Sequence, residues 1–319
     1  MPRYPVKKKI FLFLFILVDK SISVMYNFST LAYHHVKVNI IRSFELRETK
    51  MKKRVLAILC AAVMLLGVVC MSGCGTESDW AAIEESGKLV IGITIYDPMN
   101  YYDENNELIG FDTEFAYAVC EKLGVEADFQ IIDWKMKETE LKSYNIDCIW
   151  NGLTVNDERR LDMDFTQSYL TNKQVVVIDS ADAATYTDAA SLAGAIISAE
   201  GGSAGETAIA ADENLSKATY SASATQTDAL LALVAGNADA IVIDYTLAIA
   251  SCGTGAYADF VILENVELAD EEYAIGFRLG SDMVEKVDAI IDELAADGTL
   301  ASIAAKYDLT ERYEEAIAK

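Results

Sequence analysis

Residues 151–170 read NGLTVNDERRLDMDFTQSYL, and they follow directly after a short buried strand that we predict at residues 145–150. An apolar, β-favouring run of that length between polar turn residues is typical of such a strand. In open α/β sheets, ligands bind beyond the carboxyl ends of the strands. Residues 151–160 are therefore expected at a binding site, where Arg159 would hold a carboxylate through two parallel hydrogen bonds.

Cationic side chains are scarce around this stretch. The 319-residue chain has a formal net charge of −24, but residues 1–73 hold 12 Lys+Arg and 3 Asp+Glu, so residues 74–319 carry −33. Such an acidic surface repels phosphate backbones, which argues against nucleic acid as a partner. On residue type alone, Arg159 and Arg160 could be a surface pair bound to Asp157 or Asp162, so the context has to decide.

The segment before residue 74 has the form of an export signal. A basic start at residues 51–54 is followed by an apolar run from Val55 to Val69 and by small residues up to Cys74. That run is too short to favour a spanning helix, so we interpret residues 51–73 as a lipoprotein signal peptide. Ser72-Gly73-Cys74 resembles a bacterial lipobox, in which the cysteine is acylated; signal cleavage that leaves a free thiol is the alternative.

An export signal works near the N-terminus, so residues 1–50 are interpreted as upstream sequence translated in error ahead of a true start at Met51. Residues 74–87 are polar and contain Gly75, Ser78 and Gly87, and they are expected to form a tether. The protein would then lie outside the cytoplasm, on the outer face of the cytoplasmic membrane or in the periplasm, anchored to the membrane through the lipid on Cys74.

The remaining cysteines and histidines form no recognisable framework. Cys120, Cys148 and Cys252 are an odd, sparse set, expected as buried free thiols, with a Cys120–Cys148 bridge as the alternative. His34 and His35 are the only histidines, so no Cys/His metal spacing exists. We expect neither a metal site nor a cofactor.

Strand and helix patterns alternate along the rest of the chain. Strands are predicted at residues 88–95, 127–132, 174–178 and 272–278, with a helix at 111–123 that ends at Gly124 and terminal helices at 283–294 and 300–307. Residues 141–149 and 233–241 also resemble each other, each running from a helix through Asn-x-Asp into a buried strand. Two similar α/β units suggest two lobes, with the cleft between them as the expected site.

A glycine cluster, residues 200–206, precedes a predicted helix. Backbone N–H groups and the positive end of the helix dipole at such a turn favour an anion. The cluster has no P-loop lysine, which argues against nucleoside triphosphates.

Residues 85–310 resemble the bacterial extracellular solute-binding proteins of the polar amino-acid class, family 3, which serve ABC importers. The residues that carry the resemblance lie in the family's order along the chain, and they are Tyr96-Asp-Pro-Met, Glu107-Leu-Ile-Gly-Phe-Asp112, Asn145-Ile-Asp147, Leu153-Thr-Val-Asn-Asp-Glu-Arg159, Asp164-Phe-Thr166, Gly202-Ser203, Ala238-Asp239-Ala240 and Asp244. The resemblance implies a two-lobed periplasmic-binding-protein fold of type II, each lobe a mixed or parallel sheet flanked by helices, with two hinge crossovers. Lobe 1 would hold residues 88–175 and 275–319, and lobe 2 residues 176–274.

The resemblance also implies a role for each site residue. Arg159 would bind the α-carboxylate of an amino acid, helped by Thr154 and the backbone of Gly202 and Ser203. Asp244 would take the α-ammonium with the Gly152 carbonyl, and Tyr96 and Trp134 would flank the side chain. Asn151 and Glu200, which depart from the family pattern, suggest a polar ligand side chain. Arg160 is assigned to the surface.

Elementary electrostatics supports a pair of opposite charges here. A buried zwitterion loses its hydration, so each of its charges needs a partner. We expect a monomer that captures a free amino acid and passes it to a membrane permease without catalysis. Two alternatives are a dehydratase-like enzyme that uses Glu200 or Asp97 as general acid or base, and a sensory amino-acid-binding module.

Overall fold

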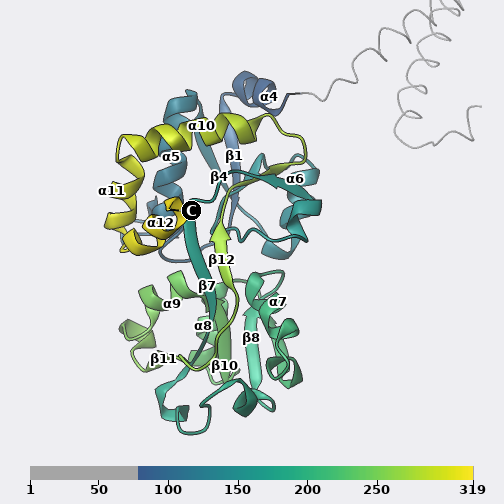
Figure 1. The fold of residues 1–319 in the computed structure, drawn as a ribbon, viewed down its shortest axis with the longest axis vertical. Coiled ribbons are helices and arrows are strands. Elements are labelled where there is room, and N and C mark those ends of the chain that lie inside the picture. Colours follow the sequence, from purple (N-terminus) through teal and green to yellow (C-terminus); the bar gives the residue numbers. More distant parts are fainter. Residues whose placement is uncertain (1–77, 319) are drawn as a thin grey trace, which may run out of the picture. The chain divides into compact units, whose positions relative to one another are not determined.

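The computed structural model describes residues 78–318, which form two α/β lobes joined by two crossing segments (Figure 1). This confirms the predicted two-lobed fold with mixed sheets flanked by helices. The predictions for residues 1–50, for the signal peptide at 51–73 and for Cys74 lie outside the described residues. The predicted lobe limits, residues 88–175 with 275–319 and residues 176–274, remain a prediction.

Lobe 1 is built on a five-stranded sheet in the order β4 (Glu126–Ile131), β1 (Lys88–Ile93), β5 (Cys148–Ile149), β13 (Gly276–Arg278), β6 (Met163–Phe165). The first three strands are parallel, and β13 runs antiparallel to both β5 and β6. Helix α5 (Phe111–Leu123) ends at Gly124 in a left-handed conformation, as predicted. The lobe also contains α6 (Lys137–Lys142) and the short hairpin of β2 (Tyr101–Tyr102) and β3 (Leu108–Ile109).

Lobe 2 is built on a second sheet in the order β11 (Phe260–Ile262), β7 (Leu170–Asp179), β10 (Ala240–Asp244), β8 (Ile196–Glu200), β9 (Thr219–Ser223). Its helices are α7 (Ala204–Ala211), α8 (Gln226–Val234) and α9 (Tyr245–Ser251). β8, β9 and β10 are parallel, whereas β7 is antiparallel to β10.

The sequence repeat corresponds to one structural unit in each lobe. The Asp147 carboxylate accepts the Val90 N–H at 2.9 Å, which links the start of β5 to β1. The Asp239 carboxylate accepts the Ile196 N–H at 2.7 Å and links the start of β10 to β8 in the same way. Because each aspartate joins two parallel strands at their amino ends, the residues that follow both strands emerge at the opposite edge of the sheet.

Two strands connect the lobes. β7 pairs with β12 (Asp270–Tyr273) at its start and with β10 further along, without a break at residue 175 (Figure 1). The strand predicted at 272–278 is wrong as one element, because it is divided into β12 and β13, which belong to different sheets. Ala274 and Ile275 lie between them, where the Ile275 N–H donates to the Thr166 hydroxyl at 3.0 Å and the chain passes from one lobe to the other.

Both ends of the described chain pack on lobe 1. Residues 79–86, predicted within a tether, instead form helix α4 (Asp79–Ser86), capped by Ser78. The Arg278 guanidinium holds it with an ion pair to Asp79 at 2.9 Å. A buried guanidinium needs a carboxylate, and Asp79 supplies one, so this part of the segment folds into the lobe.

The terminal helices are α10 (Met283–Ala296), α11 (Thr299–Lys306) and α12 (Thr310–Ile317). α11 was predicted as the last helix, so α12 is an addition; its buried residues Tyr313 and Ala316 pack it against the start of β7. Cys120 and Cys148 are free and buried, so they form no bridge, and Cys252 is free and half-buried. Among residues 78–318 no helix has both the length and the apolar character to cross a membrane.

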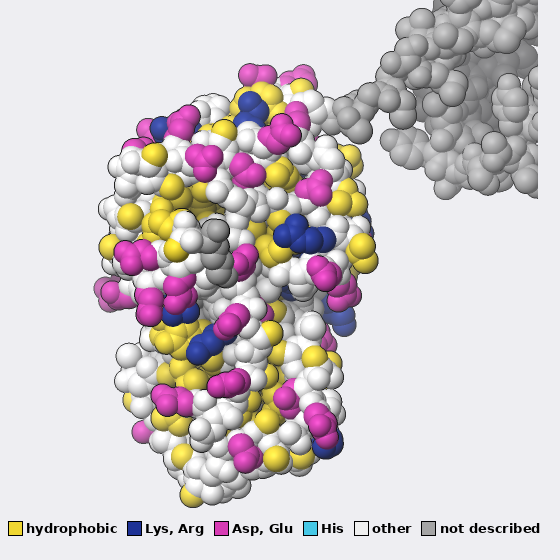
Figure 2. All heavy atoms as spheres, viewed as in Figure 1, with side chains coloured by type: hydrophobic (Ala, Val, Ile, Leu, Met, Phe, Trp, Pro, Cys, Tyr) yellow, Lys and Arg dark blue, Asp and Glu magenta, His cyan; other side chains and the backbone are white. Residues whose placement is uncertain are grey.

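Acidic side chains lie over both lobes on the face shown in Figure 2, with Lys and Arg between them in small groups. The excess of acidic over basic residues in this part of the sequence is therefore visible on the surface of both lobes. Arg160 is exposed, as predicted, and its guanidinium lies 5.4 Å from the centre of the Phe165 ring.

Candidate ligand-binding site between the lobes

A small cavity collects polar side chains from both lobes. Its lining residues share one feature, a position at or just beyond the carboxyl end of a strand or at the start of a helix, and they are Trp134, Asn151, Gly152, Thr154, Arg159, Glu200, Ser203, Ala204, Gln226 and Asp244. Its volume of about 10 Å³ has room for about one water molecule. An amino acid therefore enters only if the lobes separate or these side chains move.

Arg159 begins the short helix η2 (Arg159–Leu161) in lobe 1, and its side chain is buried. The Asn156 side chain accepts its N–H at 2.8 Å, and its guanidinium donates to the carbonyls of Thr154 at 2.7 Å and Gly202 at 3.3 Å. No carboxylate among residues 78–318 lies within 4.0 Å of it, and burial lowers its pKa. A desolvated cation without a counter-ion can attract an anion strongly.

The turn at Gly202 and Ser203 faces Arg159 from lobe 2. Ser203 caps α7 by accepting the Glu206 N–H at 3.1 Å, and the Gly202 N–H donates to the Glu206 carboxylate at 2.6 Å. The N–H groups expected to hold an anion are therefore partly occupied from within the turn. Gly202 does not line the cavity; its carbonyl accepts from Arg159 and, at 2.9 Å, from the Lys137 ammonium.

Asp244 ends β10 in lobe 2, and its carboxylate is surrounded by side-chain amides. It accepts hydrogen bonds from Asn172 at 2.9 Å, from Gln174 and from Gln226, and its own N–H donates to Gln226 at 2.9 Å. Burial raises its pKa, although these hydrogen bonds oppose the shift. No Lys or Arg among the described residues pairs with it, so its negative charge is available to a cation.

Thr154 does not have a free hydroxyl. It donates to the Glu271 carboxylate at 3.1 Å, and the same carboxylate accepts from Asn172 at 2.9 Å and Gln174 at 3.0 Å. Burial and then the nearby Asp244 raise the pKa of Glu271 to about 7. Glu271 and Asp244 thus share two amide donors, so a second carboxylate lies close behind the one that lines the cavity.

Asn151 lines the cavity with its hydrogen bonds already made inside lobe 1. Its carbonyl oxygen accepts from the N–H and hydroxyl of Thr94 at 2.9 and 2.8 Å, and its amide donates to the Thr94 carbonyl at 2.8 Å and to Asn100 at 2.7 Å. An Asn side chain has two donors and two acceptor lone pairs, and all are used. Asn151 therefore fixes the loop, and the polar ligand group expected from it has no basis in the structure.

Gly152 and Tyr96 fit closely against each other. Gly152 has φ +56°, its N–H donates to the Asp112 carboxylate at 2.7 Å, and a Cβ here would lie 1.9 Å from the Tyr96 hydroxyl. Tyr96 is buried behind this glycine and does not line the cavity. It was expected as a wall for the ligand, but it supports the Gly152 loop from within lobe 1.

Trp134 does line the cavity, at the start of the short helix η1 (Trp134–Met136) that follows β4. Asp133 caps this helix by accepting the Lys135 N–H at 3.0 Å. The Lys137 ammonium lies 5.0 Å from the Trp134 ring centre and forms an ion pair with Glu138 at 3.1 Å. The ring is therefore held in place and offers an apolar face to a ligand side chain.

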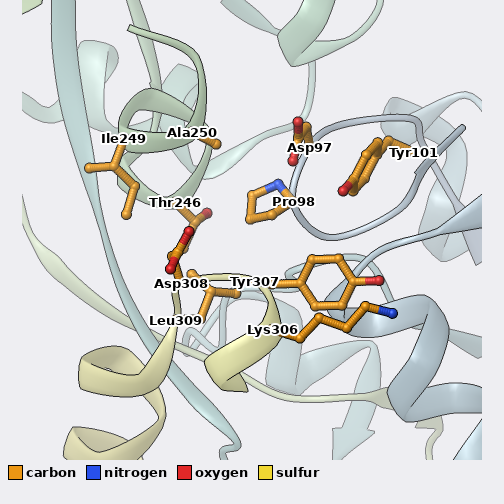
Figure 3. A pocket seen from close by; sticks show the side chains of 10 residues that line it. All are labelled: Asp97, Pro98, Tyr101, Thr246, Ile249, Ala250, Lys306, Tyr307, Asp308 and Leu309. Atoms are coloured by element: carbon orange, nitrogen blue, oxygen red, sulfur yellow. The ribbon is translucent and has the colours of Figure 1, made fainter. Parts of the chain in front are cut away.

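A larger cavity, of about 440 Å³, lies elsewhere between the lobes (Figure 3). The loop Asp97–Tyr101, helix α9 and the end of α11 contribute its lining residues. Lys306 and Tyr307 both bind Glu114 there, so these polar groups are already partnered. Asp97 belongs to this cavity and Glu200 to the smaller one, so the two carboxylates considered for an enzyme do not share a site.

Sequence reasoning missed Gln226, Lys137 and Glu271. Thr225 caps α8 at the Asp228 N–H, and this Thr-x-x-Asp pattern places Gln226 in the first turn of the helix. That signal could have located Gln226 beside a cleft. Lys137 follows Trp134 by three residues, so its position was within reach of that prediction. Nothing local to the sequence brings in Glu271, which lies on β12.

The protein has two α/β lobes joined by two crossing strands. One cavity between them is lined by a buried arginine without an ionic partner and by an aspartate that accepts hydrogen bonds from side-chain amides. These features define a two-lobed binding protein for a small polar ligand. The chain belongs to the bacterial extracellular solute-binding proteins, family 3, whose model matches residues 89–310. These proteins are extracytoplasmic. This family agrees with the one that the sequence motifs indicate.

Three known proteins show the likeness. The L-cystine-binding protein TcyJ of Escherichia coli (strain K12) is 25% identical over 249 residues, covering 77% of this chain and 92% of that protein. The structure of an ABC uptake transporter substrate-binding protein from Streptococcus pneumoniae with bound histidine is 29% identical, with TM-score 0.66, covering 73% of this chain and 96% of the other. The ancestral amino acid-binding protein AncCDT-1, described as a precursor of cyclohexadienyl dehydratase, is 26% identical with TM-score 0.66, covering 72% and 99%.

Proposed function

We propose that this protein binds a free α-amino acid between its lobes and delivers it, as a monomer and without catalysis, to the permease of an ABC importer. The observation that carries the proposal is the pair of uncompensated charges on opposite lobes, Arg159 on η2 and Asp244 on β10, at one cavity. The α-carboxylate would bind Arg159 and the α-ammonium Asp244, with the Gly152 carbonyl. Because the two charges lie on different lobes, a zwitterion would favour the closed arrangement over the open one.

A thermal-shift screen of the purified protein against the twenty amino acids, cystine and ornithine tests this function. A ligand present at 100 times its dissociation constant stabilises the folded state by about 2.7 kcal/mol, which raises the midpoint measurably. We expect a shift with at least one chemically related group of amino acids. A folded protein whose midpoint stays the same with every compound would contradict amino-acid binding.

We further propose that the protein is anchored to the cell membrane through lipid on Cys74. The support is the signal-like segment at 51–73 with its lipobox-like end. Metabolic labelling with a radioactive fatty acid should mark the wild-type protein, and Cys74→Ser should lose both the label and the membrane fraction. Equal labelling of the two proteins would contradict the anchor.

The enzyme alternative receives less support. A dehydratase would need a positioned acid or base beside its substrate. Of the two candidate residues, Glu200 lines the small cavity together with Arg159 and Asp244, and Asp97 lines the larger cavity. The likeness to a dehydratase precursor concerns a protein that is itself described as amino acid-binding.

A further inference from the structure

A zwitterion bound as proposed would leave one ionisable group of the cavity unused. Its carboxylate would pair with Arg159 and its ammonium with Asp244, which are both free of ionic partners among residues 78–318. The third ionisable group at the cavity wall is the carboxyl group of Glu200, at the end of β8. This group needs a partner of its own, because a buried polar group without one is costly.

One carboxyl oxygen of Glu200 has no such partner among residues 78–318, while the group as a whole interacts with the Thr94 hydroxyl. The Glu200 side chain is 2% exposed, and its Oε1 atom makes no hydrogen bond in the part of the chain that the structure describes. Most buried polar atoms in folded proteins do have a partner. A cavity-lining carboxyl oxygen without one therefore indicates that the ligand provides the donor.

The nearby cations are already engaged. Lys137, on α6, forms an ion pair with Glu138 at 3.1 Å and donates to the carbonyls of Gly202 at 2.9 Å and Trp134 at 3.3 Å. Arg159, on η2, is the group left for the ligand carboxylate. Asp244, on β10, adds a second negative charge to this side of the cavity, so the surroundings of Glu200 favour a positive ligand group.

We infer that Glu200 selects α-amino acids whose side chain carries a positive charge, by pairing with that charge inside the cavity. The inference rests on the proposed function and adds the ligand class to it. A neutral polar side chain could form a hydrogen bond with Glu200, but only a positive one would gain the stronger charge-assisted hydrogen bond to its ionised carboxylate.

Isothermal titration calorimetry of the purified protein tests the inference with basic and neutral ligands of similar shape. The basic probes are L-arginine, L-lysine and L-ornithine; L-citrulline is the uncharged counterpart of arginine, and L-glutamine is a second neutral probe. We expect a basic amino acid to bind at least about tenfold more tightly than either neutral one, because charged hydrogen-bond partners are stronger. A neutral amino acid that binds as tightly would overturn the inference and leave amino-acid binding intact. If none of the five binds and the wider screen is also negative, both would fail.

Two variants assign the preference to Glu200. Glu200→Gln keeps the shape of the side chain and removes its ionisable group. The ratio of the dissociation constants of the neutral and the basic ligand should therefore fall to about one. Glu213→Gln makes the same change of net charge in lobe 2 at a side chain that is 92% exposed, and it should keep the preference. A Glu200→Gln protein that keeps the wild-type preference would overturn the inference.

Proton release provides a test that needs no variant. Burial and then repulsion from Asp244 raise the pKa of Glu200 to about 8, while Lys137 and Arg159 oppose the shift. At pH 7 the group is therefore mainly protonated, and pairing with a cation would transfer its proton to the buffer base. The binding heat of a basic amino acid should then change with the ionisation enthalpy of the buffer. Because Asp244 and Glu271 also have raised pKa values, L-citrulline is the reference, and a basic amino acid whose heat depends on the buffer no more than that of L-citrulline would overturn the inference.

Discussion

Arg159 brings a positive charge into the protein interior with only carbonyl groups as hydrogen-bond partners. The other buried arginine among the described residues, Arg278, pairs with Asp79 at 2.9 Å and Asp147 at 3.2 Å. This difference indicates different roles. The charge of Arg278 is compensated within the protein, which suits a structural role, whereas the charge of Arg159 can be compensated by a bound anion. A buried charge is retained at a cost, and binding an anion offsets that cost.

Substitution of Arg159 tests this distinction. Arg159→Ala should weaken binding of the cognate amino acid by about 2–5 kcal/mol, because a desolvated carboxylate would be left unpaired. Arg160→Ala is the matched control, since its side chain is exposed, and it should bind as the wild type does. Titration calorimetry measures both, and equal losses at the two positions would contradict the site.

The contact between Gly152 and Tyr96 can be tested by a double-mutant cycle. Gly152→Ala places a Cβ 1.9 Å from the Tyr96 hydroxyl and 3.0 Å from the Tyr273 ring at φ +56°, so we expect it to destabilise the fold by about 1–3 kcal/mol. Tyr96→Phe removes the hydroxyl and should recover part of that loss in the double variant. Urea unfolding of the four proteins measures the coupling. Purely additive losses would show that the hydroxyl is not the obstacle.

At the scale of single elements, the docking of α4 shows how a polar segment becomes part of a domain. The Ser78 hydroxyl caps the helix at the Ala81 N–H, and the Asp282 side chain accepts the Trp80 N–H at 3.1 Å. Ile83 buries the apolar side of the helix against lobe 1. A short helix gains little stability by itself, so these tertiary contacts hold it in place.

Asp79→Ala measures the contribution of the α4 ion pair. It leaves the buried Arg278 with one of its two carboxylates, so the free energy of unfolding should fall by about 1–3 kcal/mol. Glu85→Ala on the exposed side of the same helix should change it by less than about 0.5 kcal/mol. The denaturant midpoints of the two variants measure both changes in stability. An unchanged midpoint for Asp79→Ala would show that α4 adds no stability through Arg278.

For the whole molecule, three buried carboxyl groups predict how stability depends on pH. Burial raises the pKa of Asp112 and Glu271 to about 7 and that of Glu200 to about 8. The folded state therefore binds more protons than the unfolded state between about pH 4.5 and 8. These groups stabilise the fold fully below their unfolded pKa values, and this contribution is lost as the pH rises through the folded values.

The ligand-free protein should accordingly be less stable at pH 8 than at pH 5.5. Each group contributes up to about 1.4 kcal/mol per pH unit while it titrates. Asp103, Asp282 and Asp297 have lowered pKa values, so they are ionised in both the folded and the unfolded state throughout this pH range and do not change the trend. Urea midpoints across this range measure the slope, and Glu200→Gln should flatten it. A midpoint that rises towards pH 8 would contradict the prediction.

Much of the architecture could be predicted because it is encoded locally. Apolar periodicity and Gly124 located α5, and the Asn-x-Asp repeat located β5 and β10 with the loops that follow them. The strand predicted at 272–278 failed for a reason that the pattern does not contain: its halves join different sheets. Local patterns indicate that a residue is extended, but not which partner strand it meets.

The sequence by itself determined that Arg159 and Asp244 follow strands of two similar units, and this was sufficient to place each beyond the carboxyl end of a strand in its own lobe. Only the tertiary structure decided that Gln226 and Glu271 share the surroundings of Asp244, that Asn151 is fully hydrogen-bonded inside lobe 1, and that Tyr96 lies behind Gly152. The reason is that burial and hydrogen-bond partners depend on distances between segments far apart in the chain. Those distances are set by how the strands and loops pack within each lobe and along the crossing strands.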